Sequence, residues 1–315
     1  MDLETVKCDI CNSLNYKLLF KTKDIQFENN GQFDIVKCEN CGLIYLNPRP
    51  TKKEIEKYYP KEYKPYQSKD EKSEKSRKTS NIFYKVMRFL AGKKSITGIN
   101  EIFDKILEGK VLDLGCGSGE LLKELKEKGF ECYGVEMDKN AVEICRKNNL
   151  KVIQGDIQEY IKKINAKFDV IILSHVLEHL YNPSFVIREI SRILADDGVF
   201  IIAIPSADSL MFNLFKSKWH SIDSPRHLYL FSTKTLSSLL QKYNLAIEEK
   251  HNYITYTEIA GTLYYFFGKK LKWLFYNKFS LVLIFLLSAF LSRINKNGIV
   301  VYEIRKLKQR INKCR

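Results

Sequence analysis

The stretch that most constrains this chain is Val111–Glu120, with the sequence VLDLGCGSGE. A short apolar run there predicts a buried strand, three glycines at alternate positions predict a turn, and the residues from Glu120 onward predict a helix. Glycines lack the Cβ atoms that would keep a ligand away from the backbone, and they permit positive φ. The free N–H groups at the start of the helix then face a bound ligand. The stretch therefore predicts a loop that binds a nucleotide-like cofactor.

Later segments continue an alternation of strands and helices. Apolar runs at 131–138, 151–156 and 168–174 end on polar residues, and further strands are expected at 198–205, 245–251 and 298–304. This order predicts an α/β fold with a largely parallel sheet. Ligands of such sheets bind beyond the carboxyl ends of the strands, where the polar residues stand.

The glycine spacing is Gly-x-Gly-x-Gly, with Asp113 two residues before the first glycine. This pattern resembles motif I of the class I S-adenosylmethionine-dependent methyltransferases, and the resemblance covers about residues 100–255. It implies a seven-stranded Rossmann-like sheet and S-adenosylmethionine as cofactor. It places Asp113 and the loop at the methionine end, Glu136 at the ribose, Asp156 near the adenine and Ser174 in the pocket wall. The cofactor-binding residues that it implies are Asp113, Gly115, Cys116, Gly117, Glu136, Met137, Asp156, Ile157 and Ser174. The alternative is that Asp113 and Asp156 only cap turns.

Candidate catalytic residues follow the fourth strand in the sequence SHVLEHL, residues 174–180. Methyl transfer requires alignment of the acceptor and, for some acceptors, removal of a proton. His175 suits that role because the pKa of imidazole lies near neutrality. The spacing of His175, Glu178 and His179 also resembles a metal-binding helix, but no third ligand is evident in this stretch, and we favour pocket lining.

The connection Trp219–Ser232 is unusually polar, and its Pro-Arg-His-Leu segment recurs in the methyltransferase subgroup that the chain resembles. Asp223, Arg226 and His227 are candidates to hold or deprotonate the acceptor. The alternative is that Arg226 and His227 brace the loop against the sheet.

Two Cys-x-x-Cys pairs, Cys8/Cys11 and Cys38/Cys41, are separated by 26 residues. Four thiolates complete the tetrahedral shell of a structural Zn²⁺ site. The chain begins without a secretory signal, so the cysteines are expected to stay reduced in the cytoplasm.

The segment 37–50 resembles the zinc ribbon that precedes methyltransferase domains in surface-glycan and natural-product clusters, including sugar C-methyltransferases. This resemblance implies a role in substrate binding, with Tyr45, Asn47 and Arg49 facing the pocket. The alternative is that these three residues pack the ribbon onto the main domain.

We expect a zinc ribbon at 1–50, a helix and flexible polar linker at 51–80, and the methyltransferase domain at 81–315. Thr51 and Glu54 have capping-box spacing. Residues 67–80 are all polar and predict a linker or a mobile flap. Apolar residues recur at helical spacing from Asn81 to Leu107.

The net charge of +15 is concentrated near the end of the chain, where residues 261–315 hold twelve Lys or Arg and one acid. An apolar insertion at about 256–297 separates the last two strands. The uncharged run Phe279–Leu291 is too short to span a bilayer and too apolar to lie bare in water. We expect a helical lid on the membrane surface through 263–293; the alternative is packing on the protein or on a second subunit.

These features predict methyl transfer to a small acceptor, such as a sugar or a lipid-linked glycan intermediate of surface-polysaccharide synthesis. The expected location is the cytoplasm, at the inner face of the membrane. One alternative is an RNA methyltransferase, although basic and apolar residues interleave in a way that favours lipid over nucleic acid. A non-catalytic cofactor-binding scaffold is the other. The acceptor atom and the oligomeric state stay open.

Overall fold

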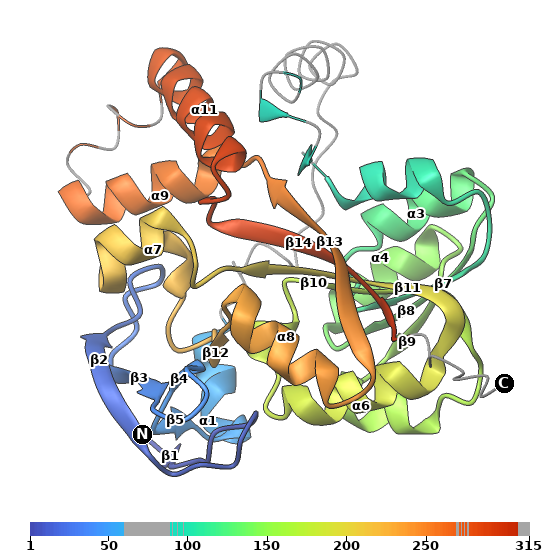
Figure 1. The fold of residues 1–315 in the computed structure, drawn as a ribbon, viewed down its shortest axis with the longest axis horizontal. Coiled ribbons are helices and arrows are strands. Elements are labelled where there is room, and N and C mark those ends of the chain that lie inside the picture. Colours follow the sequence, from blue (N-terminus) through green and yellow to red (C-terminus); the bar gives the residue numbers. More distant parts are fainter. Residues whose placement is uncertain are drawn as a thin grey trace, which may run out of the picture.

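A computed structural model describes residues 1–59, 89, 91–92, 94–96, 98–268, 271, 273, 275 and 277–307. Within this part of the chain the centre of the molecule is an eight-stranded sheet with the order β6-β13-β14-β11-β10-β7-β8-β9 (Figure 1). Its strands are β6 (Ser95–Ile96), β7 (Lys110–Leu114), β8 (Glu131–Glu136), β9 (Lys151–Gln154), β10 (Phe168–Ser174), β11 (Leu194–Pro205), β13 (Leu245–Tyr253) and β14 (Ile299–Lys306).

All seven predicted strands are confirmed, and β6 adds an eighth at one edge, parallel to β13. Strands β9, β8, β7, β10 and β11 are parallel, whereas β14 runs antiparallel between β11 and β13. The carboxyl ends of the five parallel strands therefore meet at one edge of the sheet, where the predicted cofactor residues stand.

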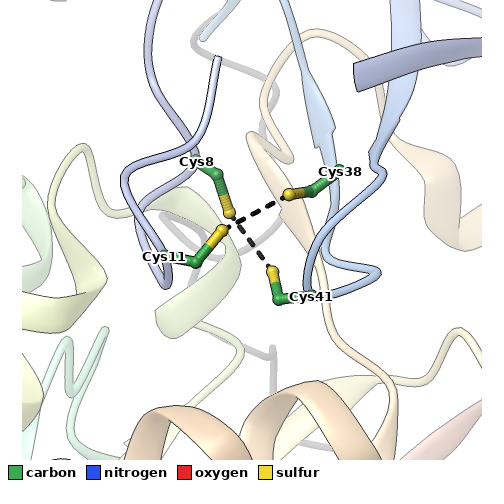
Figure 2. A group of neighbouring side chains, drawn as sticks. All are labelled: Cys8, Cys11, Cys38 and Cys41. Atoms are coloured by element: carbon green, nitrogen blue, oxygen red, sulfur yellow. Dashed lines mark hydrogen bonds between the residues drawn. The ribbon is translucent and has the colours of Figure 1, made fainter. Parts of the chain in front are cut away.

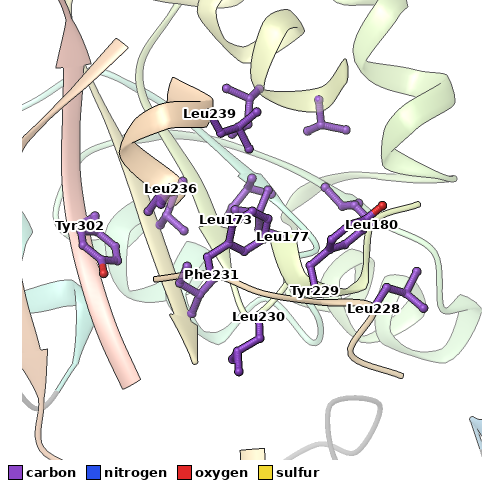
Figure 3. Packing of buried hydrophobic residues seen from close by; sticks show 14 of the residues in the cluster. Leu173, Leu177, Leu180, Leu228, Tyr229, Leu230, Phe231, Leu236, Leu239 and Tyr302 are labelled. Atoms are coloured by element: carbon purple, nitrogen blue, oxygen red, sulfur yellow. The ribbon is translucent and has the colours of Figure 1, made fainter. Parts of the chain in front are cut away.

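Helices cover both faces of the sheet because side chains alternate along its strands. Helices α3 (Glu120–Glu127) and α4 (Lys139–Lys147) pack on one face, together with the 3-10 helix Ile99–Lys105. Helices α6 (Pro183–Ile193) and α8 (Thr233–Gln241) cover the other. Figure 3 shows part of this second core, where Leu173 of β10 lies beneath Leu236 and Leu239 of α8.

The N-terminal segment forms a separate four-stranded sheet with the order β12-β4-β3-β2. Three of its strands come from the predicted ribbon: β2 (Tyr16–Thr22), β3 (Phe33–Cys38) and β4 (Ile44–Leu46). The fourth, β12 (Tyr229–Leu230), comes from the polar connection after α7 (Leu210–Phe215), and it pairs antiparallel with β4. A short pair, β1 (Leu3–Glu4) and β5 (Arg49–Pro50), closes the segment. The ribbon sheet is thus completed by a strand from the second half of the chain.

Helix α1 (Lys52–Ile55) begins where predicted, since the Thr51 hydroxyl accepts from the Glu54 N–H at 3.3 Å. Short 3-10 helices lie at Glu56–Tyr58, Ile161–Lys163, Leu177–His179, Lys216–Lys218 and His220–Ile222, and α5 spans Ile157–Tyr160. The predicted linker 67–80 and most of residues 81–98, the first part of the predicted helical stretch 81–107, lie outside the described residues. Where that stretch is described, Ser95–Ile96 form the strand β6 instead of a helix, and Ile99–Lys105 form a 3-10 helix.

The predicted helical insertion between the last two strands is confirmed. It contains α9 (Tyr256–Phe267) and α11 (Lys278–Arg293), which pack on each other at the end of the sheet that carries β6 and β13 (Figure 1). Among the described residues, none of the helices has both the length and the hydropathy that crossing a bilayer requires.

Candidate active site

The glycine loop takes the backbone shape that its sequence predicts. Gly115, Gly117 and Gly119 all have positive φ, at 83°, 53° and 78°. A Cβ atom on Gly115 would lie 2.4 Å from Cγ2 of Val176, so a side chain has no room there. The backbone is therefore bare at the carboxyl end of β7, and α3 begins directly after it.

Glu136, the last residue of β8, is tied to this loop. One carboxylate oxygen accepts the Gly117 N–H at 2.8 Å, and the other accepts from Met137 and Asp138 at 2.7 and 2.9 Å. The side chain is largely buried, yet it lines the cleft described next. Glu136 therefore holds the loop after β7 against the carboxyl end of β8.

A cleft of about 340 Å³ opens over the carboxyl ends of β7, β8, β9 and β10. Its lining includes seven of the nine predicted cofactor residues, together with side chains from α1 and from the segment after β10. The lining residues are Lys52, Ile55, Glu56, Tyr59, Gly115, Gly117, Glu136, Met137, Gly155, Asp156, Ile157, Gln158, Ser174, His175, Val176, His179, Leu180 and Tyr181. Its volume falls in the range of small-molecule sites.

Two predicted cofactor residues, Asp113 and Cys116, are not part of that lining. Asp113 is buried, and its Oδ1 has no hydrogen-bond partner in the described part of the chain. Burial, together with the negative charge of Glu136, raises the pKa of Asp113 to about 7. Asp113 therefore does not cap a turn, and it lies beneath the loop as an acid that an approaching positive charge would ionise.

Asp156 combines both proposed roles. Its side chain caps α5 by accepting the Gln158 N–H at 2.6 Å, as the turn-capping interpretation predicts. It also lines the cleft, and its second oxygen lies 3.5 Å from the Lys52 ammonium. Lys52 thus brings the segment after the ribbon to the far end of the cleft.

His175 lines the same cleft as Glu136. It is held at a positive φ of 57°, and its N–H bonds the carbonyl of Ala203 at 2.8 Å. A non-glycine residue at positive φ is costly and is common at functional sites. Its imidazole is 45% exposed, and Nδ1 lies 3.6 Å from a Glu178 carboxylate oxygen. His175 is therefore free to meet an acceptor in the cleft.

His179 lines the cleft as well, and His227 packs behind it with ring centroids 4.6 Å apart. Burial, together with the charge of His227, lowers the pKa of His179 to about 4, so the ring is neutral. His227 does not reach the cleft lining; its Nδ1–H donates to the carbonyl of Ser221 at 2.8 Å. The structure thus brings together two histidines that are 48 positions apart in the sequence.

Arg226 is fully buried, and its guanidinium is saturated. It donates to both oxygens of Asp223, to both oxygens of Asp24 and to the carbonyl of Tyr58 at 2.6–3.1 Å. Burial would raise the pKa of Asp223, but the charges of His227 and Arg226 hold it below its ordinary value. Asp223 is outside the cleft lining. These contacts favour the bracing role for Arg226 and Asp223, and a catalytic role for Asp223 stays a prediction.

Two of the three ribbon residues proposed for substrate contact pack against the main domain instead: Arg49, and Tyr45, whose ring stacks on Tyr229. Asn47 accepts the Val6 N–H at 2.9 Å within the ribbon. Arg49 donates to Glu4, to the carbonyl of Tyr181 and to the hydroxyl of Tyr229. Tyr45 and Asn47 are buried, and none of the three lines the cleft. The geometry therefore favours the packing interpretation.

Sequence reasoning missed two sets of residues. Asp24, the ribbon partner of Arg226, lies in a stretch without a motif. Lys52 and Tyr59 form a cleft wall from α1 and the turn after it, and the aromatic crowding near Tyr58 was the available signal. Both sets depend on contacts between distant parts of the chain.

The four predicted metal-binding cysteines converge in the ribbon (Figure 2). The sulfur atoms of Cys8 and Cys41 are 3.4 Å apart, those of Cys11 and Cys38 are 3.5 Å apart, and all four lie within 4.8 Å of one another. None of them forms a disulfide.

Comparison with known families identifies the domain. The family model described as "Methyltransferase domain" matches residues 84–250, just over half of the chain. The chain belongs to this methyltransferase family. The match spans the glycine loop, Glu136, Asp156 and the segment around His175, which line most of the cleft; the wall formed by Lys52 and Tyr59 lies outside the match.

Curated relatives include two ubiquinone biosynthesis O-methyltransferases. That of Proteus mirabilis (strain HI4320) is 29% identical over 106 residues, which cover 32% of this chain and 43% of the relative. That of Pelagibacter ubique (strain HTCC1062) is 33% identical over 105 residues, covering 32% and 44%. The chain thus spans less than half the length of the relatives that it matches.

Solved structures with a similar fold include a possible histamine N-methyltransferase from Thermotoga maritima, with a TM-score of 0.44 and 18% identity over 74% of this chain and 96% of that one. Coclaurine N-methyltransferase bound to N-methylheliamine and S-adenosylhomocysteine has the same score and identity, over 76% and 74%.

Proposed function

We propose that this protein transfers a methyl group from S-adenosylmethionine to oxygen, nitrogen or carbon of a small acceptor. The observation that carries the proposal is the cleft, which is lined both by the bare glycine loop with Glu136 and by Ser174, His175 and His179. The cofactor supplies the electrophilic methyl group. The protein supplies alignment, a carboxylate for ribose hydroxyls and an exposed imidazole beside the acceptor.

Each side of the cleft has a task in this proposal. Gly115 and Gly117 would let the cofactor approach the backbone, and Asp156 and Ile157, which also line the cleft, would border its adenine. When the acceptor is a hydroxyl, His175 would accept the proton that the hydroxyl gives up, and the cofactor would supply the methyl group. His175 suits this step because its imidazole is nearly half exposed while its backbone is anchored on β11.

Cofactor binding is tested by calorimetry with S-adenosylhomocysteine on the full chain. We expect heat from one site in the wild type and at least a tenfold loss of affinity in Gly115→Ala, because the new Cβ meets Val176. Gly129→Ala is the matched control, since Gly129 also has positive φ but has nothing within 4 Å of an added Cβ. Absence of heat in the wild type would refute the proposal, whereas heat without methyl transfer to any acceptor would support the non-catalytic cofactor-binding scaffold.

For the acceptor we propose a sugar or a lipid-linked glycan intermediate. The apolar outer face of α11, described below, supports an acceptor held near a membrane. Mass spectrometry of nucleotide sugars and lipid extracts, incubated with methyl-labelled cofactor, identifies the product by one added methyl group. The RNA alternative would be favoured instead if the labelled methyl group appeared in RNA and in no sugar or lipid, and if the protein bound RNA in a salt-sensitive way.

We also propose that Cys8, Cys11, Cys38 and Cys41 hold a structural Zn²⁺ ion. Sulfur atoms 2.3 Å from a tetrahedral ion lie about 3.8 Å from one another, and the observed separations of 3.4 and 3.5 Å come close to this value. Four protein ligands leave no position for substrate, so the ion contributes folding energy to the ribbon.

Finally, we propose that α11 docks on a lipid surface. Its outer face is a stripe at helical spacing, exposed by 41–73%: Phe279, Val282, Leu283, Leu286, Leu287 and Phe290. The inner face packs through Ile284, Phe285 and Ala289. The surrounding sequence is strongly basic, which suits anionic headgroups better than a second copy of an equally basic chain.

Cosedimentation with anionic phospholipid vesicles tests this docking. Phe290→Glu should weaken binding about tenfold or more, because burying an aromatic side chain is worth about 1.5–3 kcal/mol. Leu107→Glu is the control, since Leu107 is equally apolar and 88% exposed outside the insertion. Equal binding by both variants, or dimerisation without vesicle binding, would refute the lipid proposal.

A further inference from the structure

A second cluster of metal-ligating side chains lies next to the cleft. Glu178, His179 and His227 each place one ligand atom within 4.8 Å of the others. The first two residues follow β10 in the 3-10 helix Leu177–His179, and His227 comes from the connection that precedes β12. Because His179 lines the cleft, the cluster borders the cleft that would hold the acceptor.

Glu178 is the unexplained member of this cluster. Its side chain is only 2% exposed, and neither carboxylate oxygen has a hydrogen-bond partner in the part of the chain that the structure describes. The nearest nitrogens, Nδ1 of His175 and Nε2 of His227, are 3.6 and 3.9 Å from Oε1. Burying a carboxylate without a hydrogen-bond partner costs folding free energy, and a bound cation would offset that cost.

Hydrogen bonds at Nδ1 orient the rings of both His179 and His227. Nδ1 of His179 lies 3.0 Å from the carbonyl of Arg226, and Nδ1 of His227 lies 2.8 Å from the carbonyl of Ser221. Because a carbonyl only accepts, each Nδ1 carries the proton and each Nε2 keeps a lone pair. An outer hydrogen bond of this kind fixes the tautomer of histidines that ligate metals.

We propose that Glu178, His179 and His227 bind one divalent transition-metal ion, whose remaining positions face the cleft and accept an oxygen atom of the acceptor. Two imidazoles and a carboxylate suit Zn²⁺, Mn²⁺, Fe²⁺ or Co²⁺, and three protein ligands leave the shell open. Ligands 2.0–2.1 Å from a tetrahedral ion lie about 3.3 Å apart. The 3.9 Å between Oε1 of Glu178 and Nε2 of His227 would therefore close by less than 1 Å, and the ligand atom of His179 lies within 4.8 Å of the other two.

The buried pair of Arg226 and Asp223 positions this site. Arg226 supplies the carbonyl that orients His179, and Oδ2 of Asp223 lies 3.9 Å from Nε2 of His227. The metal site itself stands on the geometry of the three side chains. Its contact with the acceptor rests on the proposed methyl transfer, because only that reaction places an acceptor in the cleft.

A third cluster on β13 and β14, formed by Glu249, His251 and Glu303, also has its possible ligand atoms within 4.8 Å of one another. There the imidazole of His251 already bonds Glu303, and none of the three residues lines the cleft. This cluster therefore provides a matched control for adventitious binding.

The test uses the full chain with its ribbon filled with zinc and Co²⁺ as the probe. Equilibrium dialysis and metal analysis should find one cobalt in addition to one zinc per chain. Glu178→Gln and His227→Gln should each weaken cobalt binding at least tenfold, and His251→Gln should leave it unchanged. No bound cobalt in the wild type, or loss in His251→Gln alone, overturns the proposal.

Two further measurements keep the outcomes separate. Heat from S-adenosylhomocysteine in Glu178→Gln and His227→Gln shows that the variants fold, and absence of that heat in the wild type refutes the cofactor proposal without touching the metal site. Azide should change the visible spectrum of the bound cobalt, because a small anion enters open positions. An unchanged spectrum would show a closed shell and refute the contact with the acceptor.

Discussion

Replacement of Arg226 tests whether one buried side chain holds the ribbon on the methyltransferase domain. Its guanidinium joins three segments: Asp24 in the ribbon, the carbonyl of Tyr58 after α1, and Asp223 in the connection before β12. It also lies 4.9 Å from the centre of the Phe27 ring. In Arg226→Met the side chain keeps much of its length but loses every one of these donors.

The expected cost follows from the two carboxylates that would remain. Asp24 and the side chain of Asp223 are 0% and 10% exposed, and removing one partner of a buried ion pair costs about 3–5 kcal/mol. With an unfolding entropy of about 2 cal/mol/K per residue, a chain of 315 residues loses about 1.5 °C per kcal/mol. Arg226→Met should therefore lower Tm by about 5–8 °C.

The assay is thermal unfolding followed by circular dichroism, with hydrogen exchange to locate the change in residues 16–46. Arg188→Met is the control, because Arg188 is 56% exposed and its pair with Glu189 is worth less than about 1 kcal/mol. Adding Asp24→Asn to Arg226→Met should recover part of the loss, since one unpaired charge disappears.

The reasoning is refuted if Arg226→Met unfolds within about 1 °C of the wild type. Lost methyl transfer at unchanged Tm would show that Arg226 holds the acceptor, the role that its contacts do not favour. Arg226→Lys separates charge from geometry, because lysine keeps the charge but cannot donate to both aspartates in a fork.

Two further predictions concern the cofactor and the ribbon. Because burial raises the pKa of Asp113 to about 7, the protein without cofactor should lose stability as the pH rises from about 4 to 7. For the same reason, its affinity for the positively charged cofactor should rise about tenfold between pH 6 and pH 8. Calorimetry at several pH values checks this affinity, and Asp113→Asn should abolish its pH dependence. A zinc chelator should lower the Tm and expose four thiols to a thiol reagent, while Cys132 and Cys145 stay protected by burial; a preparation whose thiols react equally fast before and after chelation would contradict the zinc site.

Local patterns predicted the sheet and the cofactor side of the cleft well. The loop at Gly115, the acid at Glu136 and the strand at 168–174 are signals within short windows, where periodicity and glycine spacing determine the conformation. The seven-stranded, Rossmann-like sheet then followed from the family resemblance. The eighth strand, β6, was missed because two residues are too short for any pattern.

The acceptor side was harder to predict because its contacts join distant positions. No local pattern pairs His179 with His227, so a third metal ligand near His175 could not be predicted. Asp24 has no motif around it, and its burial against Arg226 depends on how the ribbon docks. Such contacts are set by tertiary packing and leave no local periodicity.

Strand β12 has a consequence for how this protein can be divided. Residues Tyr229 and Leu230 hydrogen-bond to β4, and the same short connection carries Arg226 and His227. A fragment starting at Thr51 would leave β12 unpaired and expose its backbone N–H and C=O groups, which can pair with another chain. Trimming the amino terminus for expression should thus produce aggregates, and exchanging the ribbon between homologues would require the 223–231 connection to travel with it.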